Sequence, residues 1–192
     1  MLEPQDLPGR YGRVIHSIDR LLAAVKCPAV VGGGWAVWRH GFVGRVTQDL
    51  DVVVGAEQVD ELIRAASVAG FEVLTTQPGR WPKLLHKETQ IVVDLLPEGQ
   101  RPGTTSHPAP TTLPHPSRLG ASGNALRYIT LPGLIELKLG AGRAKDESDV
   151  VELIIANPGQ IPTIRAHLGT VHSSYVAAFD RLVERANEQQ DR

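Results

Sequence analysis

Two aspartates separated by one residue are the first side chains in this sequence whose type and spacing could do chemistry. Asp49 and Asp51 lie in residues 48–54, which begin polar and become wholly apolar, a pattern that predicts a strand running from a wet edge into a covered sheet. Residues two apart on a strand project from the same face, so both carboxylates could reach one cation. Because two such charges repel each other, Mg²⁺ or Mn²⁺ would stabilise them. The pair predicts a divalent metal site, with a solvated strand start as the alternative.

A third carboxylate, Asp94, interrupts an apolar run at residues 91–96. An uncompensated acid in a covered sheet costs on the order of several kcal/mol or shifts its pKa. Asp94 is therefore expected to have a charged partner or to face an open edge of the sheet.

A run of glycines precedes the aspartate pair. Gly33 and Gly34 follow a short apolar run at residues 28–31 and precede residues 35–40, which contain no helix breaker, so we predict a strand, a turn and a short helix. Without Cβ atoms at the turn, backbone N–H groups and the positive end of the helix can approach a phosphate. Arg45 and Thr47 lie between this turn and the aspartates and could bind phosphate oxygens or be ordinary loop residues.

Hydrophobic periodicity predicts the elements that would position these residues. Apolar residues at helical spacing predict helices over residues 11–26, 57–69, 146–156, 161–168 and 171–186, and one that starts at residue 132 and ends at Gly140 or Gly142, in addition to the short helix at 35–40. Short apolar runs predict strands over residues 28–31, 48–54, 71–74, 83–86, 90–96 and 126–130, with a hairpin connection at residues 87–89. The strand, helix, strand order predicts an α/β (α+β) fold.

Residues 97–124 are rich in Pro, Gly, Ser, Thr and His and show no periodicity, so we predict a long flexible loop, either a lid or a disordered segment. We expect residues 1–142 to form the core that contains this loop. Residues 143–192 are expected to be C-terminal helices that pack on that core.

Composition limits the function classes. The 20 Lys and Arg residues are balanced by 21 Asp and Glu residues, which excludes a broad basic field for non-specific nucleic-acid binding but allows a local basic patch. A single cysteine, Cys27, excludes an internal disulfide framework and a multi-cysteine zinc site. No apolar run approaches the ~20 residues of a membrane helix, and the N-terminus lacks a signal-peptide core. We expect a cytoplasmic protein with no membrane partner.

Three quoted stretches resemble a known superfamily. Residues 30–54 read VVGGGWAVWRHGFVGRVTQDLDVVV, and residues 92–99 read VVDLLPEG; together they resemble the polymerase-beta-type nucleotidyltransferases. Residues 131–151, LPGLIELKLGAGRAKDESDVV, are similar to a segment of AbiEii-type proteins, minimal nucleotidyltransferases of which many are toxins of toxin–antitoxin systems. The resemblance implies a nucleotidyltransferase fold, a short mixed central sheet flanked by helices with a helical C-terminal part.

The resemblance also implies a role for each matching residue. Gly33 and Gly34 would cradle the triphosphate, and Asp49 and Asp51 would bind metal, while Asp94 would complete the metal site or help to deprotonate the acceptor. Lys138 would contact a phosphate, with Arg45 as a second phosphate ligand and Thr47 beside it. Residues Arg143, Lys145, Asp146 and Asp149 are expected to form a supporting ion-pair network. One departure is Trp35, which stands where many active members have Ser or Thr after the glycines.

The expected function is an enzyme that uses Mg²⁺ or Mn²⁺ to move a nucleoside monophosphate from a nucleoside triphosphate such as ATP to a hydroxyl group. The resemblance implies an RNA acceptor such as tRNA, or a protein, and a toxin with an antitoxin partner. A second hypothesis is a nucleotidyltransferase that modifies an aminoglycoside or lincosamide antibiotic. An acidic pocket would favour a cationic drug and a basic groove would favour RNA. The third hypothesis, supported by Trp35, is a non-catalytic member that binds a nucleotide or a partner.

Overall fold

The computed structural model describes residues 3–75, 81–123 and 125–191. These residues form a six-stranded mixed sheet with the order β3-β4-β5-β2-β1-β6. Strand β2 pairs with β5 in parallel and with β1 in antiparallel orientation, β1 pairs with β6 in parallel, and β3, β4 and β5 are antiparallel neighbours. The strands are β1 (Ala29–Val31), β2 (Leu50–Val54), β3 (Phe71–Thr75), β4 (Lys83–His86), β5 (Ile91–Pro97) and β6 (Arg127–Tyr128).

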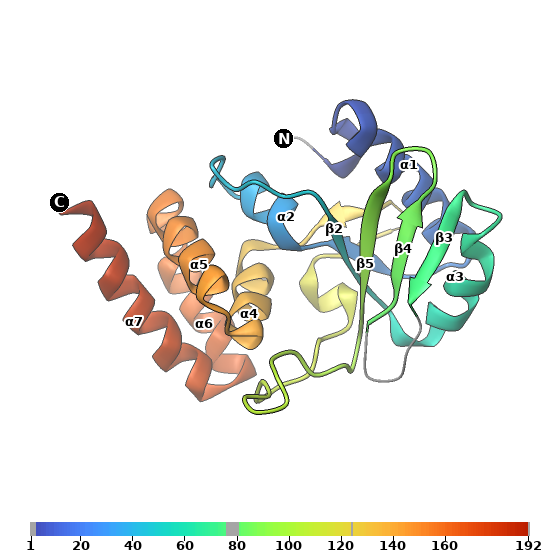
Figure 1. The fold of residues 1–192 in the computed structure, drawn as a ribbon. Coiled ribbons are helices and arrows are strands. Elements are labelled where there is room, and N and C mark those ends of the chain that lie inside the picture. The colour runs from blue at the N-terminus through green and yellow to red at the C-terminus, as the bar shows by residue number, and fades with distance from the viewer. Residues whose placement is uncertain (1–2, 76–80, 124, 192) are drawn as a thin grey trace.

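Seven α-helices surround this sheet in the described part of the chain (Figure 1). They are α1 (Gly9–Ala24), α2 (Gly33–Arg39), α3 (Val59–Ala66), α4 (Leu131–Ala141), α5 (Ala144–Ala156), α6 (Ile161–Val171) and α7 (Ser173–Gln190). The predicted mixed α/β fold with a helical C-terminal part is confirmed. Strand β2 begins at Leu50 rather than at residue 48, so Asp49 lies in the bend immediately before the strand.

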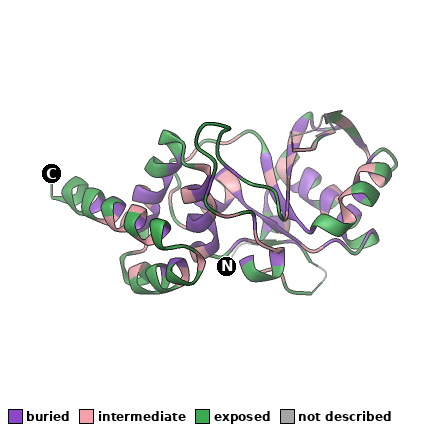
Figure 2. Cartoon of the chain, turned by 90° about the horizontal axis from the view of Figure 1, so that it is seen from below, coloured by how far each residue is buried: buried purple, intermediate pink, exposed green. Residues whose placement is uncertain are grey.

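One face of β2 and β5 is fully buried, whereas the other face is buried at Val53 but only partly buried along β5. Burial of Val52, Val53 and Val54 explains the apolar run at the end of β2. Helices α1 and α3 cover one face, and α2 and α4 to α7 gather at the other, so buried residues run through the middle of the molecule (Figures 1 and 2). Successive strand residues alternate between these two faces. The first core includes Leu50, Val52, Val54, Val93 and Leu95, whereas the second includes Val30 and Val53 with helices α4 to α7.

The alternation places the two strand aspartates on the same face of the sheet. Asp51 precedes Val53 by two residues and therefore lies on the face of the second core, and Asp94 is its partner in the parallel β2–β5 register. The carboxylates thus point toward the side on which α4 and α5 pack. The first core keeps the opposite face of both strands wholly apolar.

The segment after β5, predicted as a flexible loop, crosses the surface and contains one 3₁₀-helix, Pro116–Leu119. Gly103 and Pro108 form an isolated bridge within it, and Leu113 and Leu119 are buried. Its predicted last residue, Asn124, lies outside the described residues, and the flexibility of this segment stays a prediction. The division of the chain at residue 142 also stays a prediction. Within the described residues, no helix is both long and apolar enough to span a membrane.

Candidate active site

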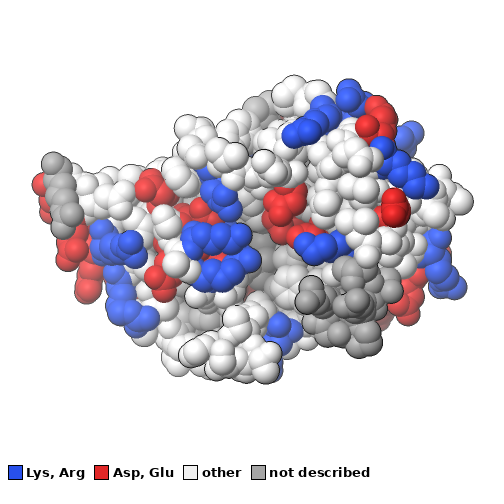
Figure 3. All heavy atoms as spheres, viewed as in Figure 1, with Lys and Arg blue, Asp and Glu red and all other residues white. Residues whose placement is uncertain are grey.

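A cavity of about 780 Å³ opens beside β2 and β5, with acidic side chains facing basic ones across a hollow in the molecular surface (Figure 3). All eight residues that the sequence singled out line this cavity. They are Gly33, Gly34, Arg45, Thr47, Asp49, Asp51, Asp94 and Lys138. The structure thus brings these residues together at one cavity, although they come from elements that span more than half of the chain.

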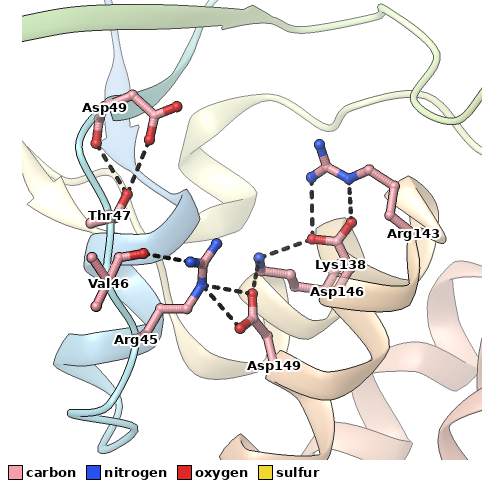
Figure 4. Close-up of polar contacts among 8 residues, drawn as sticks. All are labelled: Arg45, Val46, Thr47, Asp49, Lys138, Arg143, Asp146 and Asp149. Atoms are coloured by element: carbon pink, nitrogen blue, oxygen red, sulfur yellow. Dashed lines mark hydrogen bonds and ion pairs between the residues drawn. The ribbon is translucent and has the colours of Figure 1, made fainter.

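Asp49 and Asp51 approach the cavity from the beginning of β2. The Thr47 hydroxyl donates a hydrogen bond to Oδ1 of Asp49 over 3.0 Å and lies 3.4 Å from its backbone oxygen (Figure 4). Thr47 thus fixes the orientation of the Asp49 carboxylate, a more specific role than the general phosphate contact that the resemblance implied.

The glycine turn makes room for two of these side chains. A Cβ atom added to Gly33 would lie 1.7 Å from Oδ2 of Asp51, and one added to Gly34 would lie 2.6 Å from Cβ of Thr47. Gly33 also has a φ of 57°, which any residue with a side chain rarely adopts. The glycines are therefore needed where Asp51 and Thr47 pack against the start of α2, in addition to any approach of phosphate.

The Asp51 carboxyl is held in an unfavourable electrostatic environment. Burial, and then the negative charges of Asp49 and Asp94, raise the pKa of Asp51 from 3.8 to about 6, and the positive charges of Lys138 and Arg143 counteract this only in part. An ionised carboxylate that burial and negative neighbours destabilise is stabilised when a cation binds beside it. The surroundings of Asp51 thus favour the arrival of a positive charge.

Asp94 has the charged partner that its apolar surroundings required. Nζ of Lys83 lies 2.7 Å from Oδ1 and 2.9 Å from Oδ2 of Asp94, and the two residues are register partners on β4 and β5. The sequence analysis missed Lys83. The hairpin connection at residues 87–90 offered a signal, because pairing His86 with Ile91 across it sets Lys83 opposite Asp94.

Lys138 lies in a buried ion-pair network rather than free at the cavity surface (Figure 4). Its Nζ is 3.0 Å from Oδ1 of Asp146 and 2.6 Å from Oδ2 of Asp149, and the Lys138 side chain is only 7% exposed. Arg45 contacts the same Asp149 at 3.1 Å, and Arg143 contacts Asp146 at 2.5 Å. The predicted network is present in part: Arg143, Asp146 and Asp149 belong to it, whereas Lys145 is exposed and in none of its ion pairs. It includes instead Lys138 and Arg45, the two residues expected to bind phosphate.

The network is electrostatically well compensated. Burial alone would raise the pKa of Asp146, but hydrogen bonds and charge from Arg143 and Lys138 outweigh it, so its pKa lies below the usual value. The hydrogen bond to Asp146 raises the pKa of Arg143 against the effect of burial. The ion pairs of this network connect α4, α5 and the segment that leads to β2.

Trp35 does not line the cavity. Its ring packs 4.6 Å from the ring of Tyr11 and 6.1 Å from that of Trp38, measured between centroids, and contacts the first core. Trp35 thus holds α2 against the sheet, which is the ordinary packing role of an aromatic residue at this spacing. It takes no space from a bound nucleotide.

The carboxylates fit a hard divalent cation by their oxygen chemistry and by the raised pKa of Asp51. Within residues 3–75, 81–123 and 125–191, however, no group of three or more His, Cys, Asp or Glu side chains is arranged around a common point that could hold an ion. The predicted triad of metal ligands is therefore not assembled in this structure. The ammonium of Lys83 contacts both oxygens of the third carboxylate.

Comparison with known proteins agrees with this site at the level of a superfamily. Residues 14–106, just under half of the chain, match the family model described as aminoglycoside-2''-adenylyltransferase. The match includes the glycine turn with Trp35, all three aspartates and Lys83. No curated protein sequence matches the chain.

Three solved structures are similar in outline. The solution structure of the antibiotic-resistance factor ANT(2'')-Ia has a TM-score of 0.49 and 16% identity, covering 93% of this chain and 92% of that one. A crystal structure of ANT(2'')-Ia with adenylyl-2''-tobramycin has a TM-score of 0.46 and 17% identity, covering 90% and 97%. A nucleotidyltransferase-like antigenic protein from Paracoccidioides brasiliensis has a TM-score of 0.46 and 15% identity, covering 88% and 91%. Likenesses at this level say nothing about substrate.

The sequence match covers the residues that carry the site, namely the glycine turn, the aspartate pair after it and Asp94 on the neighbouring strand. These residues meet at one cavity that is large enough for a nucleotide. The chain is therefore an enzyme of the nucleotidyltransferase superfamily.

Proposed function

We propose that this enzyme transfers a nucleoside monophosphate from a nucleoside triphosphate to a hydroxyl acceptor, with Mg²⁺ or Mn²⁺ held by Asp49 and Asp51. The observation that carries the proposal is the position of Asp51, which lies against the glycine turn and beside Asp94 in a cavity where its pKa is raised to about 6. A protein gains nothing in stability from such an arrangement of like charges. It is explained when the site binds a cation together with a polyphosphate.

The chain's own residues can be assigned parts in this reaction. Oxygen of Asp94, once released from Lys83, accepts the proton of the attacking hydroxyl group. The acceptor oxygen then bonds to the α-phosphorus while the bond from that phosphorus to the bridging oxygen breaks, and pyrophosphate leaves. A bound divalent cation would supply charge neutralisation at the phosphates and at the two aspartates. Arg101, Arg143 and Lys145, which line the cavity, supply positive charge for the triphosphate.

Two observations bear on the chemical class of the acceptor. The family match favours an aminoglycoside, because the matched family is described as aminoglycoside-2''-adenylyltransferase. The described lining carries more basic side chains than acidic ones: Arg45, Lys83, Arg101, Lys138, Arg143 and Lys145 against Asp49, Asp51, Asp94 and Asp146. That balance favours a negatively charged acceptor such as RNA over a cationic aminoglycoside. A toxin activity and an antitoxin partner stay predictions of the resemblance.

The test is transfer of label from each of the four α-labelled nucleoside triphosphates, in Mg²⁺ and in Mn²⁺, to separate panels of aminoglycosides, lincosamides, cellular RNA and cellular protein. We expect metal-dependent labelling of one panel. Asp51→Asn should lower the rate by at least about a hundredfold, since it removes a charge at the reacting phosphates. Asp60→Asn, an exposed Asp on α3, is the matched control and should retain activity.

Absence of labelling in every panel with both metals would contradict nucleotidyl transfer. Labelling that persists in EDTA, or that survives Asp51→Asn, would contradict the assigned metal site while leaving the reaction in place. The labelled panel identifies the acceptor class directly.

A further inference from the structure

The ion pair between Lys83 and Asp94 is unusual in that one flexible cation contacts both oxygens of a carboxylate assigned to the reaction. The Lys83 side chain is 46% exposed, whereas the Asp94 side chain is 19% exposed. The lysine therefore reaches in from solvent on a long flexible stem, while the aspartate is fixed within β5. The mobile partner can leave without any change in the sheet.

The contact is incomplete as a hydrogen-bonded pair. Nζ of Lys83 donates a hydrogen bond to Oδ2 of Asp94 over 2.9 Å, but Oδ1, at 2.7 Å, is buried and has no partner with hydrogen-bond geometry. A buried carboxylate oxygen without a hydrogen bond is costly. Asp94 thus retains one oxygen that is poorly satisfied by lysine and better suited to a directed ligand.

Lys83 is also placed to offset the repulsion within the site. Asp94 lies opposite Asp51 in the β2–β5 register, and the charge of Asp94 contributes to the raised pKa of Asp51. A cation on Asp94 reduces the negative charge that Asp51 experiences. In the part of the chain that the structure describes, the one ion pair of these three aspartates is the contact between Lys83 and Asp94.

We propose that Lys83 is an internal counter-ion that occupies Asp94 until a divalent cation and a nucleotide displace it. The inference rests on the proposed function, because it assigns Asp94 to the same site. While Lys83 is bound, its ammonium group hydrogen-bonds Oδ2 and lies 2.7 Å from Oδ1, so a metal ion or an incoming proton must compete with it for Asp94. Once the triphosphate arrives, its oxygens offer the released ammonium another anionic partner within the same cavity. Lys83 is therefore a positioning residue that couples metal binding to nucleotide binding.

The inference predicts that removal of the lysine charge tightens metal binding in the absence of nucleotide. Lys83→Met keeps most of the side-chain length, so Mn²⁺ no longer competes with an ammonium group. We expect the Kd for Mn²⁺, measured by the electron paramagnetic resonance of free Mn²⁺ in titrations of the whole protein, to fall roughly five- to tenfold. Lys87→Met, at the exposed end of the same hairpin, removes an equal charge and should change the Kd by less than about twofold.

A second variant shows whether the effect passes through Asp94. In the Asp94→Asn background, Lys83→Met should leave Mn²⁺ affinity unchanged within about twofold, because the partner of the lysine is already neutral. Thermal unfolding gives a readout that is independent of activity: in EDTA the Lys83→Met protein should have a lower Tm than the wild type, and Mn²⁺ should raise its Tm by more than it raises that of the wild type.

An unchanged or weaker Mn²⁺ affinity in Lys83→Met would overturn the inference, and so would failure of both proteins to bind Mn²⁺. An unchanged or weaker affinity with nucleotidyl transfer intact would leave the proposed function standing, whereas failure to bind Mn²⁺ would also contradict the metal site assigned in it. Conversely, tighter Mn²⁺ binding by Lys83→Met in a protein that transfers no nucleotide would support the role of Lys83 and contradict the proposed function.

Discussion

At the scale of single residues, the site is built around an aspartate that the fold does not stabilise. Asp51 packs against Gly33, lies opposite Asp94 on the neighbouring strand β5 and has a pKa raised to about 6. Residues under such strain are typical of functional sites, where the unfavourable arrangement is relieved by the ligand. The unfavourable free energy can be measured through its dependence on pH.

The sign of this dependence follows from the raised pKa. The folded protein binds a proton at Asp51 more tightly than the unfolded chain does, so Asp51 destabilises the metal-free fold at neutral pH, and the penalty shrinks as the pH falls from about 6 toward 3.8. We expect Asp51→Asn to raise the free energy of unfolding in EDTA by on the order of 2 kcal/mol at pH 7.5 and by roughly half as much at pH 5. Denaturant unfolding at the two pH values measures the difference.

Asp60→Asn serves as the control and should leave stability nearly unchanged at both pH values, since Asp60 is exposed on α3. A loss of stability in Asp51→Asn at pH 7.5 would mean that the Asp51 charge is satisfied in the metal-free protein, which would contradict the electrostatic account of the site.

At the scale of elements, one buried lysine joins two helices to the segment that leads to β2. Lys138 on α4 contacts Asp146 and Asp149 on α5, and Arg45 reaches Asp149 from the other side (Figure 4). A buried charge that loses its partner is costly, often more so than the pair is stabilising. The network thus fixes how the helical half of the chain meets the aspartates.

Lys138→Met is expected to lower the free energy of unfolding by about 2–4 kcal/mol without any nucleotide present, because it leaves two buried carboxylates short of a cation. Lys145→Met, which removes an exposed lysine from the same helix pair, should cost less than about 0.5 kcal/mol. Chemical unfolding of the two variants gives the comparison. An unchanged stability for Lys138→Met, together with a raised KM for the nucleotide, would instead restore Lys138 as a phosphate ligand.

At the scale of the whole molecule, the sheet separates two cores and belongs to both. The first core lies under α1 and α3, and the second continues from Val30 and Val53 of the sheet into the C-terminal helices (Figure 1). Because the sheet strands contribute side chains to each, a loss of packing on one face removes support from the other.

This arrangement predicts a single cooperative unfolding transition. Phe179 on α7 and Phe71 on β3 are fully buried in different cores, and replacing either by Ala should lower the free energy of unfolding by about 3–5 kcal/mol. Calorimetry should show one transition that moves in both variants, while the exposed Arg181→Ala on α7 leaves it in place. Two separate transitions, with only one shifted by Phe179→Ala, would show that the C-terminal helices form their own unit.

Local pattern was sufficient for much of the fold and for the residues of the site. The period of two in residues 48–54 predicted β2, and the glycine run predicted the turn before α2, because each depends on neighbours within a few residues. The predicted and observed helices differ mainly at their ends. Boundaries were less well predicted, since side-chain contacts decide where a strand or helix stops.

The sequence by itself predicted a glycine turn followed by an aspartate pair on one strand face, because spacing and strand period are local properties, and the resemblance added Asp94 to the same site. The structure places all of these residues at one cavity. Only the tertiary structure decided the charge partners of these residues. Lys83 contacts Asp94. The two cations expected at a phosphate, Arg45 and Lys138, contact Asp149, which Arg45 meets across 104 residues of chain. Pairing between side chains distant in sequence depends on how the elements pack, and hydrophobic periodicity carries no information about it.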